Sequence, residues 1–141
     1  AVKAVVNSVQ IPVFVNGDIT SCETAKTALK ASRAAGVMVG RAAMGQPWLL
    51  AQIADYISGL PVRLVPNMLQ RNLTMAKHLT DITNEKGEMG LRSARKHFAS
   101  YCDHLEESDE LRAVAMRTSS ASELKDAIFE YFLEASRLTA A

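Results

Sequence analysis

The first 57 residues alternate between short apolar runs and amphipathic stretches. This pattern predicts helix, strand, helix, strand and helix, over residues 1–9, 11–15, 21–35, 37–40 and 47–57. Both strands are continuous apolar runs, which is typical of strands buried on both faces in a parallel sheet. The middle helix has a possible capping box, Thr20 to Glu23, and Gly36 is expected to end it.

Strands that alternate with helices indicate an α/β unit with a parallel sheet. Two strands do not form a stable sheet alone, so we expect this unit to belong to a larger domain. The chain also opens without a methionine, inside an apolar segment. We therefore expect a fragment of a longer protein.

The second half predicts helices only. Residues 59–66 include two prolines and predict a linker between an α/β domain over 1–58 and a helical domain over 67–141. Apolar residues at helical spacing predict four helices there, over 67–86, 91–102, 108–117 and 120–138. In the first of them, the residues expected on the buried side are Leu69, Leu73, Ala76, Leu79 and Ile82. The predicted fold class is thus α/β followed by an all-α bundle.

Composition narrows the class of protein only slightly. The chain is 48% hydrophobic and 22% charged, which is enough apolar material for a packed core, and its net charge is +1. No apolar run approaches the roughly 20 residues of a membrane helix, so no membrane partner is expected. Cys22 and Cys102 are too few for a disulfide framework or a metal site. A cytoplasmic location is the expectation.

Glycine-containing loops follow both predicted strands directly: Asn16-Gly17-Asp18 and Gly40-Arg41-Ala42. In (β/α)8 barrels the site lies at the carboxyl ends of the strands, where such loops often hold a phosphate. Glycine lets the backbone approach an anion, and free N–H groups at a helix start point toward it. The same glycines also suit plain tight turns, and spacing alone leaves the two interpretations even.

A basic cluster lies in the second half, at Arg92, Arg95 and Lys96. On a helix these positions are i, i+3 and i+4, so the three cations share one face. Clustered like charges repel unless anions offset them, and arginine suits phosphate through its planar donors. A solvated helix face explains the same pattern, and both interpretations stay open.

Residues 11–50 resemble strands seven and eight of the tRNA-dihydrouridine synthase family. The matching positions are Asn16, Gly17, Asp18, Ile19, Gly40, Arg41, Ala42, Gly45, Pro47 and Trp48. The resemblance implies a TIM (β/α)8 barrel, of which residues 1–58 would form the last two β/α units. It also implies an FMN phosphate beside Asn16, Gly17, Asp18, Gly40 and Arg41. Met44 and Gln46 depart from the pattern of the bacterial branch.

Residues 86–98 resemble the start of a helix in the family's C-terminal tRNA-binding domain. The matching positions are Gly90, Leu91, Arg92, Arg95, Lys96, His97 and Phe98. The resemblance implies tRNA as the partner, bound through Arg92, Arg95, Lys96 and His97. From its position alone, His97 fits an RNA contact and a local hydrogen bond equally well.

The implied activity is the reduction of uridine to dihydrouridine in tRNA by reduced FMN, with NAD(P)H as reductant. The best match is the bacterial branch associated with nitrogen regulation. The family's catalytic cysteine lies in an Asn-x-Gly-Cys-Pro-like loop, which does not occur in this sequence. We therefore assign no catalytic residue and no metal ligand, interpret both cysteines as structural, and expect the chain alone to be inactive.

Two other functions fit parts of the pattern. An FMN barrel oxidoreductase acting on a small molecule would share the strand-end loops, and a non-enzymatic RNA-binding module would share the basic helix. A barrel segment with open edges is expected to self-associate or to be poorly ordered when isolated. The full-length protein is expected to be a monomer.

Overall fold

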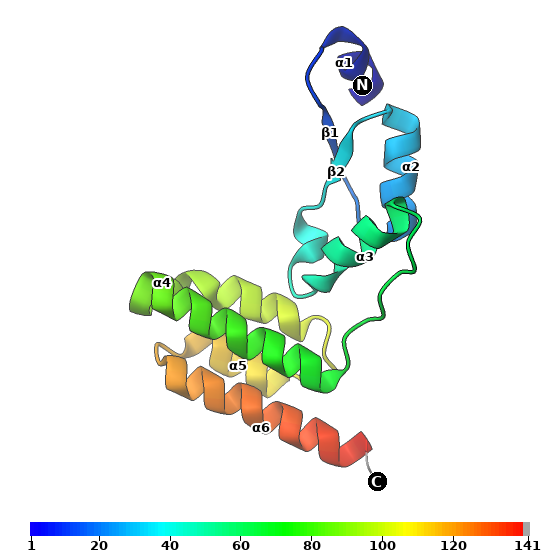
Figure 1. Cartoon of the computed structure of the whole chain (residues 1–141). Coiled ribbons are helices and arrows are strands. Elements are labelled where there is room, and N and C mark those ends of the chain that lie inside the picture. The colour runs from blue at the N-terminus through cyan, green and yellow to red at the C-terminus, as the bar shows by residue number, and fades with distance from the viewer. Residues whose placement is uncertain (140–141) are drawn as a thin grey trace. The chain divides into compact units, whose positions relative to one another are not determined.

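A computed structural model describes residues 1–139, apart from the side chains of Glu88, Leu138 and Thr139. The chain divides between Val65 and Pro66 into two compact units (Figure 1). We call the first the βα unit and the second the helical unit, and each is described by itself.

The βα unit has the predicted order of elements. These are α1 (Val2–Ser8), β1 (Phe14–Asn16), α2 (Cys22–Ser32), β2 (Gly36–Met38), the 3-10 helix η1 (Arg41–Ala43) and α3 (Trp48–Ile57). The two strands pair in parallel, with Val15 opposite Val37. The predicted parallel pairing is therefore confirmed. The helix α2 returns the chain to the start of the same small sheet, so both strands run in the same direction.

The strands are shorter and less buried than the apolar runs predict. Val15 is buried, whereas Phe14 is 63% exposed and Met38 57% exposed. Pro12 has no N–H for a ladder hydrogen bond, and β1 begins only at Phe14. Burial on both faces was the wrong prediction for these residues, because α2 and α3 cover only part of the strand pair in this chain.

The ends of α2 also differ from the prediction. The capping box is Ser21 with Thr24, whose backbone N–H donates to Ser21 Oγ over 3.2 Å, and not Thr20 with Glu23. At the other end, Arg33 adopts the left-handed conformation and closes the helix. Gly36 instead begins β2, where a Cβ atom would lie 2.6 Å from the Phe14 ring.

The segment predicted as a linker is partly held against α3. The Arg63 guanidinium donates to both carboxylate oxygens of Asp55, over 2.7 and 2.9 Å, and Gln52 Nε2 donates to the Arg63 carbonyl over 3.0 Å. These hydrogen bonds from Arg63 lower the pKa of the Asp55 carboxyl group. The pair therefore keeps its charge well into the acidic range.

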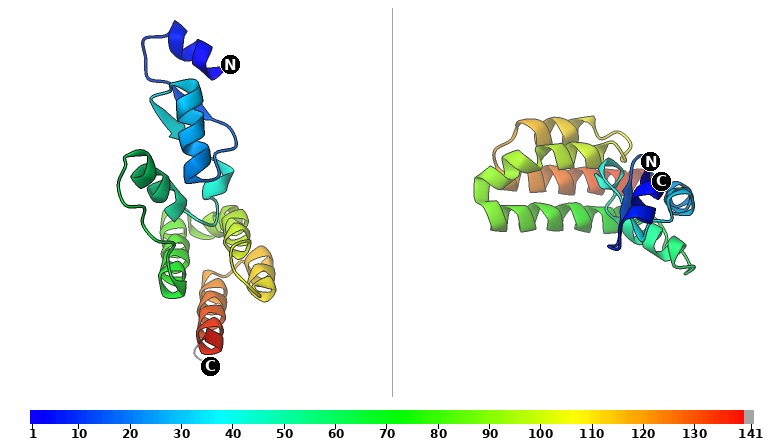
Figure 2. Two further views of the ribbon diagram at one scale, coloured as in Figure 1. Left: turned by 90° about the vertical axis from the view of Figure 1, so that its right-hand side faces the viewer. Right: turned by 90° about the horizontal axis from the view of Figure 1, so that it is seen from above.

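The helical unit contains α4 (Met68–Cys102), α5 (Asp109–Arg117) and α6 (Ala121–Thr139). The helix α4 consists of two arms, because Gly87 inside it has φ 56° and ψ −147° and the chain reverses there. The predicted turn between two helices is confirmed at Gly87 but not at Gly90, which is helical. Figure 2 shows the two arms of α4 beside α5 and α6.

The core of the helical unit comes from all three helices. Its members are Met75, Leu79, Leu91, Ala94, Phe98, Tyr101, Cys102, Leu111, Val114, Ala115, Leu124, Ile128 and Phe132. Leu79 is buried as predicted, but Leu69 is 68% exposed and Leu73 is 61% exposed. The first arm of α4, which precedes Gly87, has apolar residues over a wide arc. The side that carries Met75 and Leu79 is the one that packs into the core.

Candidate functional site

The two strand-end loops lie at one edge of the small sheet. Because β1 and β2 are parallel and Asn16 pairs with Met38, the chain leaves both strands at the same end. Asn16, Gly17 and Asp18 follow β1 there, and Gly40 with Arg41 follows β2. The structure thus brings the five predicted cofactor residues to one edge, and all five are exposed.

The space over the two loop glycines is open. A Cβ atom built on Gly17 or on Gly40 would meet no other atom within 4 Å. In the described part of the chain, the N–H groups of Arg41 and Ala42 donate to no backbone carbonyl, as expected at the start of η1. An anionic group placed here would find backbone N–H groups that have no backbone partner.

The predicted cationic face of α4 divides into two parts. Arg92 and Lys96 are exposed, one turn apart, and neither forms an ion pair with a carboxylate whose side chain is described. Arg95 instead donates to the carbonyl oxygens of Arg117 and Thr118, over 3.3 and 3.0 Å. Its guanidinium therefore supplies hydrogen-bond donors to carbonyl groups at the carboxyl end of α5. Arg92 and Lys96 remain available to bind a partner.

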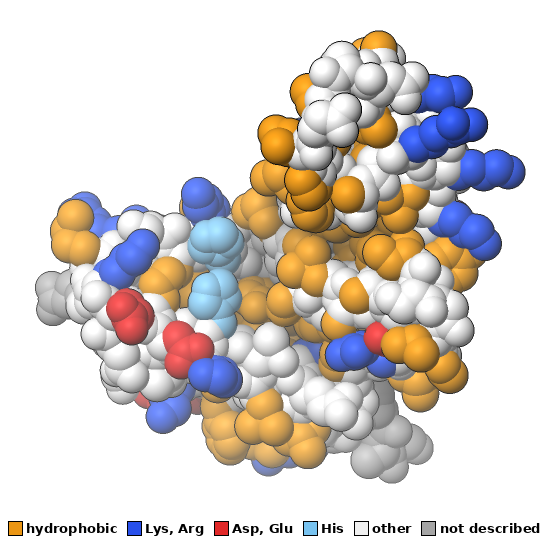
Figure 3. All heavy atoms as spheres, turned by 45° about the horizontal axis from the view of Figure 1, so that its top comes forward, with side chains coloured by type: hydrophobic (Ala, Val, Ile, Leu, Met, Phe, Trp, Pro, Cys, Tyr) orange, Lys and Arg blue, Asp and Glu red, His pale blue; other side chains and the backbone are white. Residues whose placement is uncertain are grey.

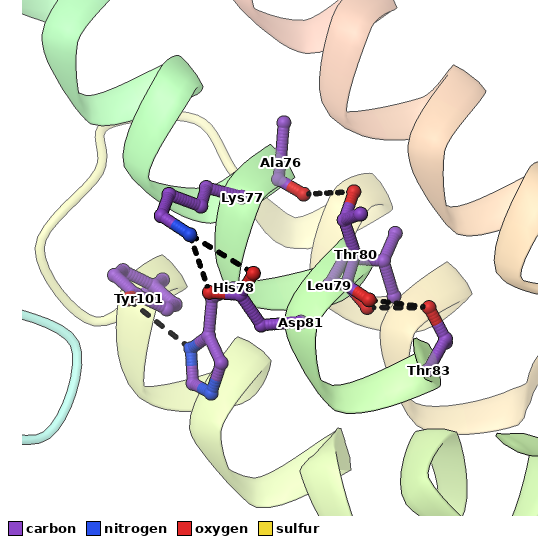
Figure 4. A network of polar contacts seen from close by, with 8 residues as sticks. All are labelled: Ala76, Lys77, His78, Leu79, Thr80, Asp81, Thr83 and Tyr101. Atoms are coloured by element: carbon purple, nitrogen blue, oxygen red, sulfur yellow. Dashed lines mark hydrogen bonds and ion pairs between the residues drawn. The ribbon is translucent and has the colours of Figure 1, made fainter. Parts of the chain in front are cut away.

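His97 lies next to a second histidine that the sequence pattern did not single out. The ring centroids of His97 and His78 are 5.6 Å apart. His78 Nδ1 lies 3.3 Å from the Tyr101 hydroxyl, and its ring stacks on Phe98 with centroids 5.7 Å apart. Figure 4 shows the side chains of His78 and Tyr101 pointing toward each other. His97 and Tyr101 are one helical turn apart, which was the available signal for this cluster.

Burial favours the neutral form of the two imidazoles. Desolvation lowers the pKa of His78, although Asp81 acts in the opposite direction. Desolvation also lowers the pKa of His97, and His78 and Lys96 reinforce that shift. The lowered pKa values favour the neutral form of both rings, and Arg92 and Lys96 are the exposed cations on the second arm of α4 that form no ion pair with a described carboxylate.

The two cysteines have the surroundings of structural residues. Cys102 is 4% exposed, and Cys22 is partly buried. Burial raises the pKa of both thiols, which disfavours the reactive thiolate. Among the described residues no group of three or more potential ligands could hold a metal ion, and no helix is long and apolar enough to cross a membrane.

A pocket of about 450 Å³ lies elsewhere in the helical unit. Its lining residues are Met68, Arg71, His104, Leu105, Glu106, Glu107, Tyr131, Glu134 and Ala135. None of the predicted site residues belongs to this lining. The strand-end edge and the Arg92–Lys96 face are open surfaces. The pocket therefore coincides with neither of the two sites that the sequence predicts.

These features define a parallel α/β segment followed by a helical bundle with a basic face. Residues 1–136 match the family model described as Dihydrouridine synthase (Dus). The chain is 36% identical over 132 residues to a probable tRNA-dihydrouridine synthase of Rickettsia conorii, covering 93% of this chain and 40% of that relative. It is 42% identical over 120 residues to a probable tRNA-dihydrouridine synthase of Rhodobacter capsulatus, covering 84% and 36%.

A third relative is the tRNA-dihydrouridine synthase B of Shewanella oneidensis, 35% identical over 135 residues, covering 94% of this chain and 41% of that protein. The chain belongs to the dihydrouridine synthase family. It spans about 40% of the length of the curated relatives described here.

Proposed function

We propose that this chain works within a longer flavoprotein that reduces uridine to dihydrouridine in tRNA. The observation that carries the proposal is the family match over residues 1–136, together with relatives whose names specify tRNA-dihydrouridine synthases. In this proposal the βα unit is the final part of a TIM (β/α)8 barrel that binds FMN. The helical unit is the part that holds tRNA.

The strand-end edge is the proposed place of the FMN phosphate. The open space over Gly17 and Gly40 and the accessible N–H groups of Arg41 and Ala42 fit a phosphate group. The Arg41 side chain adds a cation, whereas the Asp18 carboxylate repels an anion, so the phosphate should lie closer to Gly40. When bound, FMN reduced by NAD(P)H would supply the hydride for the uridine ring.

The basic face of α4 is the proposed contact with the RNA backbone. Arg92 and Lys96 are exposed and stand at i and i+4 on one helix, a spacing suited to neighbouring phosphates. Arg95 holds the end of α5 and supports this face indirectly. His97 follows Lys96 directly on the same arm of α4.

The open edges of the strand pair support the proposed self-association of the isolated chain. Among the described residues β1 and β2 pair only with each other, and Phe14 and Met38 are more than half exposed. Unpaired strand edges beside exposed apolar side chains favour pairing with another copy. In the full-length protein, neighbouring barrel strands would cover them, which agrees with the proposed monomer.

Substitution Gly40→Val in the full-length protein tests the cofactor site and the activity together. A valine side chain would occupy the open space over Gly40, so we expect flavin affinity to fall at least tenfold, or about 1.4 kcal/mol. Flavin retained after dialysis and dihydrouridine formed in a tRNA transcript are the measurements. Wild-type protein should retain flavin and form dihydrouridine.

Ala35→Val is the matched control, because Ala35 is exposed at the opposite end of β2. It should keep wild-type flavin content. Equal flavin content in all three proteins would mean that Gly40 is not part of the cofactor site. A wild-type protein with flavin but no dihydrouridine product would overturn the proposed activity.

The double variant Arg92→Ala/Lys96→Ala tests the RNA face. Each lost phosphate contact should reduce the slope of log affinity against log salt by about 0.7–0.9, so we expect a total reduction of roughly 1.4–1.8. Flavin content should not change. Lys125→Ala, an exposed cation on α6, is the control. A double variant with the wild-type salt slope would make Arg92 and Lys96 ordinary solvated residues.

A further inference from the structure

The surface cluster of His78 and His97 has features that simple packing does not require. The two rings lie side by side, with centroids 5.6 Å apart. Among the described residues, neither ring nitrogen of His97 has a hydrogen-bond partner, although the residue is partly buried. Figure 3 shows two histidine side chains side by side at the surface, next to basic side chains.

The inner ring of this pair is held rigidly. His78 stacks on Phe98 with an interplanar angle of 29°, and it meets Tyr101 edge-on while sharing a hydrogen bond with that hydroxyl group. Phe98 is itself fully buried. The position of His78 is therefore fixed by the core, and His97 rests against a preformed aromatic support.

Charge distinguishes the rings from their neighbours. The groups that face them are Asp81 and Lys77 on the first arm of α4, and Lys96 and Tyr101 on the second. Lys77 is neutralised by its ion pair with Asp81, at 2.8 Å. The two ring planes are tilted by 50° to each other, and the outer ring, His97, borders the cation of Lys96.

We propose that the His97 ring, supported from below by His78, is a stacking platform for one unpaired base of the bound RNA, beside a phosphate held by Lys96. Unpaired bases in RNA are commonly stacked on aromatic or histidine rings, and any base has a face for this. This inference rests on the proposed function, because it takes RNA as the partner.

The test compares two substitutions of His97 in the full-length protein. His97→Ala removes the ring and should weaken binding of an unmodified tRNA transcript by at least about fivefold. His97→Phe keeps a flat ring and should retain most of the affinity. Neither should change the salt slope, because stacking releases no counterions. An RNA duplex without unpaired bases should bind all variants equally.

His104→Ala is the matched control, since His104 is exposed in the same unit but lies away from this cluster, in the pocket lining. Three results would overturn the platform: wild-type affinity of His97→Ala, equal weakening by alanine and phenylalanine, or a salt slope reduced by about one unit, which means a phosphate contact. Failure of the proposed function looks different. In that case wild-type protein itself does not bind tRNA, or binds it without any effect of Arg92→Ala/Lys96→Ala.

Discussion

Replacing Phe98 by alanine is expected to lower the free energy of unfolding of the helical unit by about 3–5 kcal/mol. Phe98 is 0% exposed, and it belongs to the core that α4, α5 and α6 build together. Truncation removes a large apolar side chain and leaves a cavity that three packed helices cannot close. Urea denaturation followed by far-ultraviolet circular dichroism measures the loss.

Phe129→Ala is the matched control for this substitution. Phe129 is the same residue type on α6 but is 60% exposed, so its loss should change the free energy of unfolding by less than about 0.5 kcal/mol. Phe98 also supports the His78 ring, so its replacement should weaken RNA binding even where the unit remains folded. A destabilisation below about 1 kcal/mol would mean that Phe98 is not central to the core.

Gly90→Ala is the second substitution with a large expected effect. A Cβ atom at this position would collide with the carbonyl oxygen of Ile82 and approach the Lys86 Cβ to 2.8 Å. Alanine improves helix propensity by about 1 kcal/mol, but backbone cannot move aside as a flexible side chain does. Overpacking costs about 1–3 kcal/mol and occasionally more, and a clash with backbone lies at the upper end of that range, so we expect a net loss of roughly 1–2 kcal/mol.

The neighbouring substitution Met89→Ala separates this clash from a general effect on the helix. Met89 is 69% exposed in the same turn, and its replacement should leave stability within about 0.5 kcal/mol of wild type. The same urea titration serves both variants. If Gly90→Ala were as stable as wild type or more stable, the two arms of α4 could not approach as closely as described.

The sequence predicted which segments form helices and strands better than it predicted which side of each segment is buried. The strands and helices of the βα unit follow from apolar periodicity, and parallel pairing follows from their alternation. The buried side of the first arm of α4 was partly mispredicted. Leu69, Leu73, Met75 and Leu79 all lie within a wide apolar arc, and the reversal at Gly87 selects Met75 and Leu79 for the core.

The candidate sites were also predicted only in part. The cofactor residues were expected together because parallel strands end at one edge, a rule that needs only the order of elements. The role of Arg95 could not be predicted, because its partners are backbone carbonyls of Arg117 and Thr118 on a separate helix. His78 was missed for a similar reason: only the reversal of α4 brings it beside His97.

The hairpin of α4 also bears on the order in which the chain acquires structure. The two arms of α4 are joined by a tight turn at Gly87, and α5 and α6 both pack against α4. Contacts of this local kind form early, because little chain entropy is lost in closing short loops. On a ribosome, such a segment can fold as soon as α6 emerges.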